Sequence, residues 1–246
     1  MAERIRLDLA LEQRGLVKSR ARARDAILRG TVTVNGEPAT KPSQLVGAGD
    51  RVELDDPAGR YVSRAALKLI AGLDAGNIDV TGKVCLDLGA STGGFTQLLA
   101  ERGAAKIYAV DVGHGQLHET VARLPAVLGM EGVNVRDLTR KTIPEPIDLV
   151  VSDISFVSVT KVIAAPLSLC HAGADAVILV KPQFEVGREN VGKGGIVTDQ
   201  AAIHAAVAGV IRFMSEQGWE HRHSVSSPIT GGDGNKEIVA LFRRTS

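Results

Sequence analysis

The fold of this chain is decided by Val84-Cys-Leu-Asp-Leu-Gly-Ala-Ser-Thr-Gly-Gly94, an apolar run that leads into a glycine-rich turn. Residues 84–88 have the composition of a buried β-strand, and the residues after the turn have a helical pattern that ends near Arg102. Glycines at such a turn allow the backbone to approach a ligand closely, because they carry no Cβ atom. The stretch therefore predicts a strand, a ligand-binding turn and a helix.

The sequence on both sides of this unit continues the alternation of strands and helices. Strands are predicted at 106–110, 147–151, 176–180, 223–226 and 238–242, and helices at 65–73 and 200–216. Strands separated by helices are typical of an α/β fold with a parallel, doubly wound sheet. We expect a final antiparallel strand that begins after Glu237, at the edge where the parallel strands end.

The first 54 residues follow another pattern, of two helices and then short strands. The apolar residues of a first predicted helix are Ile5, Leu7, Leu9, Leu11 and Leu16. Ser19 is the predicted N-cap of a second helix over 20–29. Strand patterns at 31–34 and 51–54, with the hairpin signal Asn35-Gly36 after the first, complete a small α+β domain.

The composition limits the classes of protein to which the chain can belong. Hydrophobic residues make up 44% of the 246 residues, which is enough for a real core, and the net charge is +1. Residues 1–60 hold 11 Lys or Arg against 9 Asp or Glu, and five of these basic residues lie within 18–29. No run reaches the ~18 apolar residues of a membrane span, and the charged N-terminus lacks a signal region, so we expect a cytoplasmic protein.

Side chains that bind metals or form disulfides are few and scattered. Cys85 and Cys170 lie in or beside apolar runs without paired spacing, so we expect buried free thiols in a reducing compartment. His114 and His118 have no cysteine or carboxylate at metal-ligand spacing. We therefore expect no metal site.

An acidic residue stands two positions before the first glycine of the turn. A carboxylate at Asp87 repels a pyrophosphate but suits a sulfonium or an α-amino group, which favours S-adenosylmethionine over NAD. Asp111, at the next strand end, suits ribose hydroxyls, and Asp137 could accept from an adenine amino group. The alternative is that these acids only cap helices or turns. The predicted cofactor-binding residues are Asp87, Gly89, Ala90, Ser91, Gly93, Gly94, Phe95, Asp111 and Asp137.

Four charged residues are expected at one edge of the sheet. Asp153 and Lys181 follow predicted parallel strands, and Glu237 precedes the antiparallel strand. Lys68 lies at the entrance to the domain. A ribose hydroxyl must lose its proton as it attacks a methyl group, and a lysine with a lowered pKa can take or stabilise that proton. We therefore predict these four residues as the catalytic group, the alternative being four separately solvated charges.

Six motifs of the chain resemble one known family. They are Ser63-Arg-Ala-Ala-Leu-Lys-Leu69, Asp87-Leu-Gly-Ala-Ser-Thr-Gly-Gly-Phe-Thr96, Ser152-Asp-Ile-Ser-Phe156, Lys181-Pro-Gln-Phe-Glu185, Gly192-Lys-Gly-Gly-Ile-Val197 and Asn235-Lys-Glu237. In combination they resemble the TlyA family of ribosomal RNA methyltransferases, often named haemolysins, whose catalytic domain is similar to FtsJ-type 2′-O-ribose methyltransferases. The resemblance implies a Rossmann-like seven-stranded sheet, a catalytic role for the four charged residues, and 2′-O-methylcytidine in ribosomal RNA as the product. At Arg60-Tyr-Val62 the chain departs from the Arg-Ala-Trp-type linker of some relatives.

Five further motifs resemble the small RNA-binding domain first seen in ribosomal protein S4. They are Arg6-Leu-Asp-Leu9, Ser19-Arg-Ala-Arg22, Gly30-Thr-Val-Thr-Val-Asn-Gly36, Lys41-Pro-Ser43 and Gly49-Asp-Arg-Val-Glu53. The resemblance implies an S4-type domain at 1–58, a linker at 59–63 and the methyltransferase domain at 64–246. Clustered cations neutralise phosphates, and the absence of aromatic residues from 1–58 favours folded RNA over stacked single strands.

The predicted partner is therefore ribosomal RNA or a ribosomal subunit. We expect the protein itself to be a monomer. The predicted RNA-binding residues are Arg4, Arg6, Lys18, Arg20, Arg22, Lys41, Arg64, Arg136, Arg188 and Lys193. Three other functions compete with this interpretation. A membrane-active haemolysin would need a spanning segment or a Lys-rich amphipathic helix, and a non-catalytic assembly factor would not need the charged group. A base methyltransferase commonly has prolines where this chain reads Ser152-Asp-Ile-Ser-Phe156.

Overall fold

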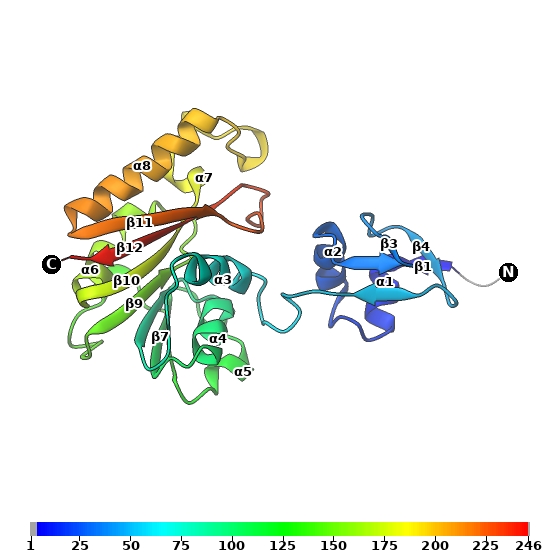
Figure 1. The fold of residues 1–246 in the computed structure, drawn as a ribbon, viewed down its shortest axis with the longest axis horizontal. Coiled ribbons are helices and arrows are strands. Elements are labelled where there is room, and N and C mark those ends of the chain that lie inside the picture. Colours follow the sequence, from blue (N-terminus) through cyan, green and yellow to red (C-terminus); the bar gives the residue numbers. More distant parts are fainter. Residues whose placement is uncertain (1–3, 246) are drawn as a thin grey trace. The chain divides into compact units, whose positions relative to one another are not determined.

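Strand β6 (Val84–Leu88) is an interior strand of a seven-stranded sheet in the computed structural model of this chain, which describes residues 4–245. It pairs in parallel with β7 (Lys106–Asp111) on one side and with β9 (Ile147–Ser152) on the other. The strand order is β11-β12-β10-β9-β6-β7-β8, with β8 (Val127–Glu131), β10 (Cys170–Val180), β11 (Trp219–Ser226) and β12 (Ile238–Arg244) (Figure 1). β12 is antiparallel to both of its neighbours. The predicted doubly wound sheet with a final antiparallel strand is confirmed.

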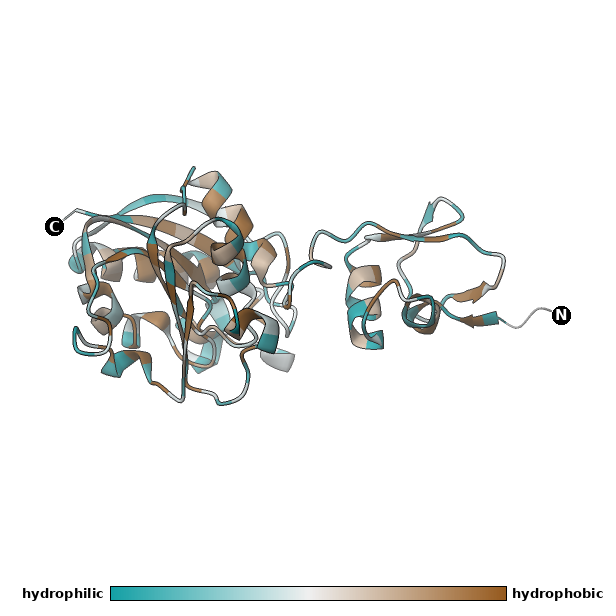
Figure 2. Cartoon of the chain, turned by 90° about the horizontal axis from the view of Figure 1, so that it is seen from below, coloured by the Kyte–Doolittle hydropathy of each residue, from teal (hydrophilic) through white to brown (hydrophobic). Residues whose placement is uncertain are grey.

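Helices cover both faces of this sheet. α3 (Ala66–Ala75) and α4 (Gly94–Glu101) pack on one face, and α8 (Gln200–Glu216) packs on the other (Figure 1). Side chains along each strand alternate between two cores, so Cys85 belongs to the core on the α3 side and Leu86 to the core on the α8 side. Figure 2 shows that hydrophobic residues are concentrated along the strands.

The shorter elements of this unit lie in its connections. They are α5 (Glu119–Ala122), α6 (Ala164–Ser168), α7 (Pro182–Glu185) and the 3-10 helices η1 (Val135–Asp137), η2 (Val159–Lys161), η3 (Arg188–Asn190) and η4 (Lys193–Gly195). β8 is an edge strand that the sequence analysis does not predict, and Leu128 and Gly129 in it are exposed. β10 begins before the predicted start at 176, since its first residues include polar side chains and an irregular register.

The N-terminal elements form a small α+β arrangement with its own core. Two helices, α1 (Leu7–Gln13) and α2 (Arg20–Leu28), pack together, and their buried residues include Leu11 and Ile27. The strands are β1 (Arg4–Arg6), β2 (Val32–Val34), β3 (Glu37–Pro38), β4 (Leu45–Gly47) and β5 (Val52–Leu54), in a β1-β4 pair and a β3-β2-β5 sheet. Ser19 caps α2 by accepting from the backbone N–H of Arg22, as predicted.

The expected extent of the first helix is wrong at both ends. Ile5 lies in β1, where it pairs with Val46, because a β-strand partner is available far along the chain. Leu16 lies beyond α1, since Gly15 has φ +69° and directs the backbone out of the helix. The hairpin prediction is confirmed, because Asn35 and Gly36 both have positive φ, 54° and 86°, between β2 and β3.

Internal contacts divide the chain into two units, Met1–Arg60 and Tyr61–Ser246. The smaller unit contains one hydrophobic cluster, and the larger contains the two clusters on either side of the seven-stranded sheet. No helix within residues 4–245 is both long enough and apolar enough to cross a membrane.

Candidate active site

The glycine-rich turn brings the end of β6 against the end of β9. Gly89 has φ +80°, and a Cβ atom there would lie 3.2 Å from both the nitrogen and the Cα of Ile154. The backbone N–H of Asp153 donates to the carbonyl of Leu88 at 3.0 Å. Only glycine adopts this conformation without strain at such a close approach. The turn therefore keeps Asp153 next to the glycine loop.

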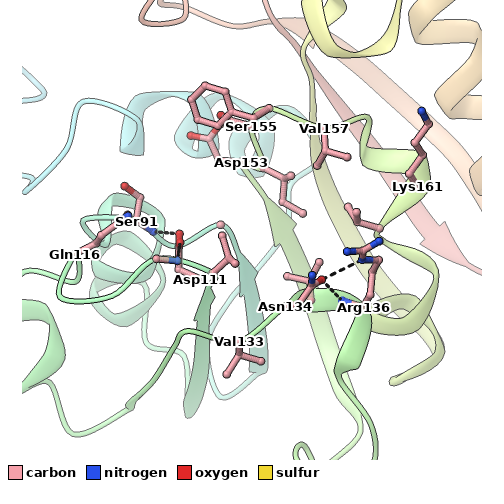
Figure 3. A pocket seen from close by; sticks show the side chains of 17 residues that line it. Ser91, Asp111, Gln116, Val133, Asn134, Arg136, Asp153, Ser155, Val157 and Lys161 are labelled. Carbon is pink, nitrogen blue, oxygen red and sulfur yellow. Dashed lines mark hydrogen bonds between the residues drawn. The ribbon is translucent and has the colours of Figure 1, made fainter.

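A cavity of about 530 Å³ opens at the carboxyl ends of β6, β7 and β9, and we call it the strand-end cavity. Ser91 and Asp111 lie on one side of it, and Asn134, Arg136 and Lys161 lie on another (Figure 3). The Asp111 carboxylate is fixed by two backbone N–H donors, from Ser91 and Gly113, each at 2.8 Å. Lys161 and Arg136 leave this wall cationic, whereas most of the remaining lining is apolar.

Asp87 is buried beneath this turn and lines none of the described cavities. Its Oδ2 accepts from the hydroxyl of Thr96 at 2.6 Å, and its Oδ1 has no hydrogen-bond partner among the described residues. Burial raises the pKa of Asp87 to about 7, the Thr96 hydrogen bond opposes the rise, and the charges of Asp153 and Asp111 add to it. Burial therefore favours the protonated form of this carboxyl.

The four charged residues predicted as a catalytic group converge, and we call them the tetrad. Lys181 Nζ lies 2.7 Å from Asp153 Oδ1, and Lys68 Nζ lies 3.7 Å from the same oxygen. Lys68 Nζ also lies 2.6 Å from Oε2 of Glu237. All four side chains are at least mostly buried. The tetrad is thus a chain of alternating charges, in which one carboxylate is shared by two ammonium groups.

The tetrad lines a second cavity, of about 340 Å³, which we call the tetrad cavity. Three residues, Asp153, Ser155 and Phe156, line both this cavity and the strand-end cavity. Lys181 Nζ also donates to the carbonyl of Asp153 at 3.0 Å and to the hydroxyl of Ser155 at 2.5 Å. The segment between β9 and η2 is therefore the common wall of the two cavities, and Lys181 holds it.

Phe156 is an element of the site that the sequence reasoning did not assign. Its side chain is 90% exposed, its φ is +70°, and it borders both cavities. Its ring centroid lies 5.7 Å from that of Phe184. A signal was present in the sequence, because Phe is scarce in this chain and Phe156 closely follows a strand end. Gln116, Asn134 and Val135 also line the strand-end cavity without having been predicted.

Most of the other predicted cofactor residues line at least one of two cavities, and the two that do not are the buried Gly93 and the exposed Asp137. Gly89, Ser91 and Asp111 line the strand-end cavity. Residues Gly89, Ala90, Ser91, Gly94 and Phe95 line a third cavity of about 90 Å³ that also reaches Asp153. Gly93 and Asp137 line none of the three, although Asp137 follows the cavity-lining residues of η1.

The predicted RNA-binding residues occupy several surfaces. In the larger unit, Arg136 lines the strand-end cavity and Arg64 the tetrad cavity, whereas Arg188 and Lys193 are exposed on η3 and η4. In the smaller unit, Lys18, Arg20 and Lys41 are exposed and Arg22 is half-buried.

Two other arginines of the smaller unit, Arg4 and Arg6, pair with acidic side chains, Asp50 and Asp8. His118 caps α5, and no group of three or more metal-binding side chains is placed to hold an ion within residues 4–245.

Comparison with known proteins gives two domain families for the chain. The profile of the FtsJ-like methyltransferases matches residues 61–244, and the profile of the S4 domain matches residues 5–52. A protein of Mycobacterium tuberculosis named 16S/23S rRNA (cytidine-2′-O)-methyltransferase TlyA is 44% identical over 244 residues, which cover 99% of this chain and 91% of the relative.

Two further relatives agree with this match. A Campylobacter jejuni protein named 23S rRNA (cytidine-2′-O)-methyltransferase TlyA is 36% identical and covers 78% of this chain and 75% of its own length. The solved structure of a protein described as a hemolysin from Streptococcus thermophilus superposes with a TM-score of 0.76 at 34% identity, covering 100% of this chain and 90% of that one. The chain therefore belongs to the FtsJ-like methyltransferases and, among them, to the TlyA family.

Proposed function

We propose that this protein transfers the methyl group of S-adenosylmethionine to a ribose 2′-hydroxyl, that of a cytidine, in folded ribosomal RNA. The observation that carries the proposal is the position of the tetrad, in a cavity that shares Asp153, Ser155 and Phe156 with the strand-end cavity. A hydroxyl bound in the tetrad cavity and a methyl donor bound in the strand-end cavity would therefore both lie next to these three residues. We choose a cytidine in ribosomal RNA as the substrate because the names of the M. tuberculosis and C. jejuni relatives give this substrate for those proteins.

The strand-end cavity fits the methyl donor. Its volume, about 530 Å³, is within the range of small-molecule sites, and the close backbone approach at Gly89 leaves no room for a side chain. Asp111 would hold the ribose of the donor and Asn134 its adenine. A cationic methionine end bound near Asp87 would favour the ionised form of its buried carboxyl, whose Oδ1 has no hydrogen-bond partner among the described residues. When bound, the donor supplies a methyl group on an electrophilic sulfonium.

The side chains of the tetrad would prepare the hydroxyl for attack. A ribose hydroxyl in the tetrad cavity would give its proton to one of the two lysines, Lys68 or Lys181, as its oxygen attacks the methyl carbon. The ammonium group of the other lysine would stabilise the negative charge that develops on the oxygen. Asp153 fixes the spacing of these ammonium groups, because it lies 2.7 Å from one and 3.7 Å from the other. Holding the oxygen, the methyl carbon and the sulfur in line supplies much of the remaining rate enhancement.

The smaller unit would deliver the RNA. The S4 match over residues 5–52 and the exposed cations of this unit support binding of a folded RNA through its phosphates. We propose an S4-type RNA-binding domain at 1–58, a linker at 59–63 and a methyltransferase domain at 64–246. Ribosomal RNA or a ribosomal subunit in the cytoplasm is the proposed partner.

Mapping of 2′-O-methyl groups on ribosomal RNA tests this function. Ribosomal subunits from cells that lack the protein should gain one or a few 2′-O-methylcytidines when incubated with the pure protein and radiolabelled S-adenosylmethionine. Nuclease digestion and chromatography of the labelled nucleosides identify the position of the label. Label on a nucleobase, or no transfer to any subunit, would contradict the proposal.

A further inference from the structure

A buried carboxylate joins two arginines at the surface of the smaller unit. Asp8, in the first turn of α1, has an exposed fraction of 0%, and its side chain accepts three hydrogen bonds. Arg6 donates from Nε to Oδ1 and from Nη2 to Oδ2, both at 3.0 Å, and Arg20 donates from Nη2 to Oδ2 at 3.2 Å. The side chains of the two arginines remain 45% and 51% exposed. We call these three residues the Asp8 cluster.

Two backbone hydrogen bonds join the start of α1, next to the Asp8 cluster, to the segment at 42–44. The N–H of Asp8 donates to the carbonyl of Pro42 at 3.1 Å, and that of Leu7 donates to the carbonyl of Gln44 at 2.7 Å. These bonds fix the turn that begins with the exposed Lys41 beside the start of α1. The N-termini of α1 and α2, and this turn, thus contribute cations to one surface.

The charge of Asp8 is fully developed at neutral pH. The hydrogen bond from Arg6 lowers the pKa of Asp8 to about 2, burial opposes this shift, and Arg20 adds to it. An anion is an unexpected member of a surface that binds phosphates, because it repels them. Here it is paired with two cations, so the cluster as a whole has a single net positive charge, and each half-exposed guanidinium keeps N–H donors that do not bond to Asp8.

A buried anion at this position can favour phosphate binding because it restricts the flexible arginine side chains before the RNA binds. A free arginine side chain loses conformational entropy when it binds a phosphate, and a side chain already held by a bidentate ion pair loses less. We propose that Asp8 is a positioning residue for RNA binding, which holds Arg6 and Arg20 as a preformed pair of guanidinium groups that receives backbone phosphates of folded RNA. This inference rests on the proposed role of the smaller unit in RNA binding.

Replacement of Asp8 separates this role from simple electrostatics. Asp8→Asn in the full-length protein removes one negative charge, so charge alone predicts tighter binding to ribosomal RNA. Positioning predicts the opposite, a dissociation constant raised by about 5- to 100-fold, because two side chains must then be ordered on binding. Glu53→Gln is the matched control, since it makes the same charge change at an exposed ion pair with Arg51. It should leave binding unchanged or slightly tighter.

A double-mutant cycle separates positioning from a role in folding. In an Arg6→Ala/Arg20→Ala background, Asp8→Asn should have no further effect on RNA affinity, because the side chains through which it acts are absent. A second variant, Arg6→Lys/Arg20→Lys, keeps both charges and loses the fork geometry, and it should also bind more weakly than the wild type.

Binding is measured by filter retention of a labelled ribosomal RNA fragment at several salt concentrations, with thermal unfolding of each variant recorded in parallel. Wild-type affinity in Asp8→Asn, or in the double lysine variant, would overturn the inference. A loss that persists in the double alanine background would also overturn it, because Asp8 would then act through the fold. No binding by the wild-type protein would overturn both this inference and the proposed delivery of RNA.

Discussion

The Nζ atom of Lys68 lies 2.6 Å from Oε2 of Glu237, and this ion pair joins the first helix of the larger unit to the residue directly before its last strand. Both side chains are almost fully buried, with 8% and 2% of their surfaces exposed. Removal of one partner from a buried pair typically costs about 3–5 kcal/mol, because the other charge is left without compensation. Substitutions in the tetrad can therefore lower stability as well as activity, and the two effects need separate measurements.

Lys181→Met should lower the rate of methyl transfer much more than it lowers the affinity for the donor. The substitution removes an ammonium group from the tetrad cavity, and loss of such a group lowers the rate by about 10²- to 10⁴-fold. Lys181 does not line the strand-end cavity but bonds to Asp153 and Ser155, which do, so the dissociation constant for S-adenosylmethionine should rise by less than about tenfold. Single-turnover transfer to ribosomal subunits and calorimetric titration of the donor measure the two quantities.

The matched control for this variant is Lys83→Met. Lys83 forms a similar ion pair, 2.8 Å from Asp175, at the opposite end of the strands. This control should lose some thermal stability and keep its turnover. Wild-type turnover in the Lys181 variant would reject the catalytic assignment.

Gly89→Ala should weaken donor binding through the backbone of the turn. A residue with a side chain at φ +80° is strained by about 1–2 kcal/mol, and the new Cβ atom would press on Ile154 at 3.2 Å. Gly82→Ala introduces the same kind of strain, at φ +71°, with no atom within 4 Å of the new Cβ. Both variants should unfold at lower temperature, but only Gly89→Ala should raise the dissociation constant for S-adenosylmethionine, by about tenfold or more. Equal donor affinities in the two variants would show that the turn does not shape the site.

Much of this site could be predicted from the sequence because the topology of the parallel sheet determines where the ends of its strands lie. Strand ends at Asp111, Asp153 and Lys181 follow from apolar runs, and the carboxyl ends of parallel strands meet at one edge of a sheet. Convergence with Glu237 then requires only that the last strand be antiparallel, which the structure confirms. The bounds of α8 also agree with the predicted helix at 200–216, because its apolar residues recur with helical spacing.

The features that the sequence did not indicate depend on contacts between distant residues. Ile5 is in a strand only because Val46 is available to pair with it. The position of Phe156 depends on Lys181, which holds one end of its loop, and on Glu185, which holds the other. Glu185 accepts from the hydroxyl of Ser158 at 2.6 Å and from the backbone N–H of Val159 at 2.8 Å. No local sequence pattern predicts hydrogen bonds between residues so far apart in the chain.

Asp87 should make the stability of the donor-free protein fall as pH rises towards neutrality. The pKa of Asp87 is about 7 in the folded protein, and its reference value for the unfolded chain is 3.8. At a pH between 3.8 and 7, the folded state therefore binds one more proton than the unfolded state. Stabilisation from this group is complete below about pH 4 and is lost as pH rises through 7, with a slope of about 1.4 kcal/mol per pH unit between pH 5 and 6.5.

Asp87→Asn should remove this contribution, so the difference in free energy of unfolding between the two proteins should itself change with pH. Urea denaturation of both proteins from pH 5 to 8.5 measures that difference. A difference that is independent of pH would mean that Asp87 is ionised throughout this range.

Phe156→Gly should lower the affinity for RNA without lowering stability. The wild-type residue has φ +70°, which strains any residue except glycine by about 1–2 kcal/mol, so glycine relieves strain at this position. Its 90% exposed ring makes little contribution to the core, yet it borders the tetrad cavity, where a nucleobase next to the reacting ribose could stack on it. Stacking of a base on an aromatic side chain contributes about 1–3 kcal/mol, so the KM for ribosomal RNA should rise by roughly 5- to 150-fold.

Leu128→Asn is the control for this variant, because it removes another exposed apolar side chain, on β8, that lines none of the described cavities. It should leave the KM for RNA unchanged. Steady-state methylation of ribosomal subunits and thermal unfolding give the two readouts for each variant. An unaltered KM in Phe156→Gly would exclude base stacking at this position. A marked loss of stability would show that the ring supports the common wall of the two cavities, which its exposure argues against.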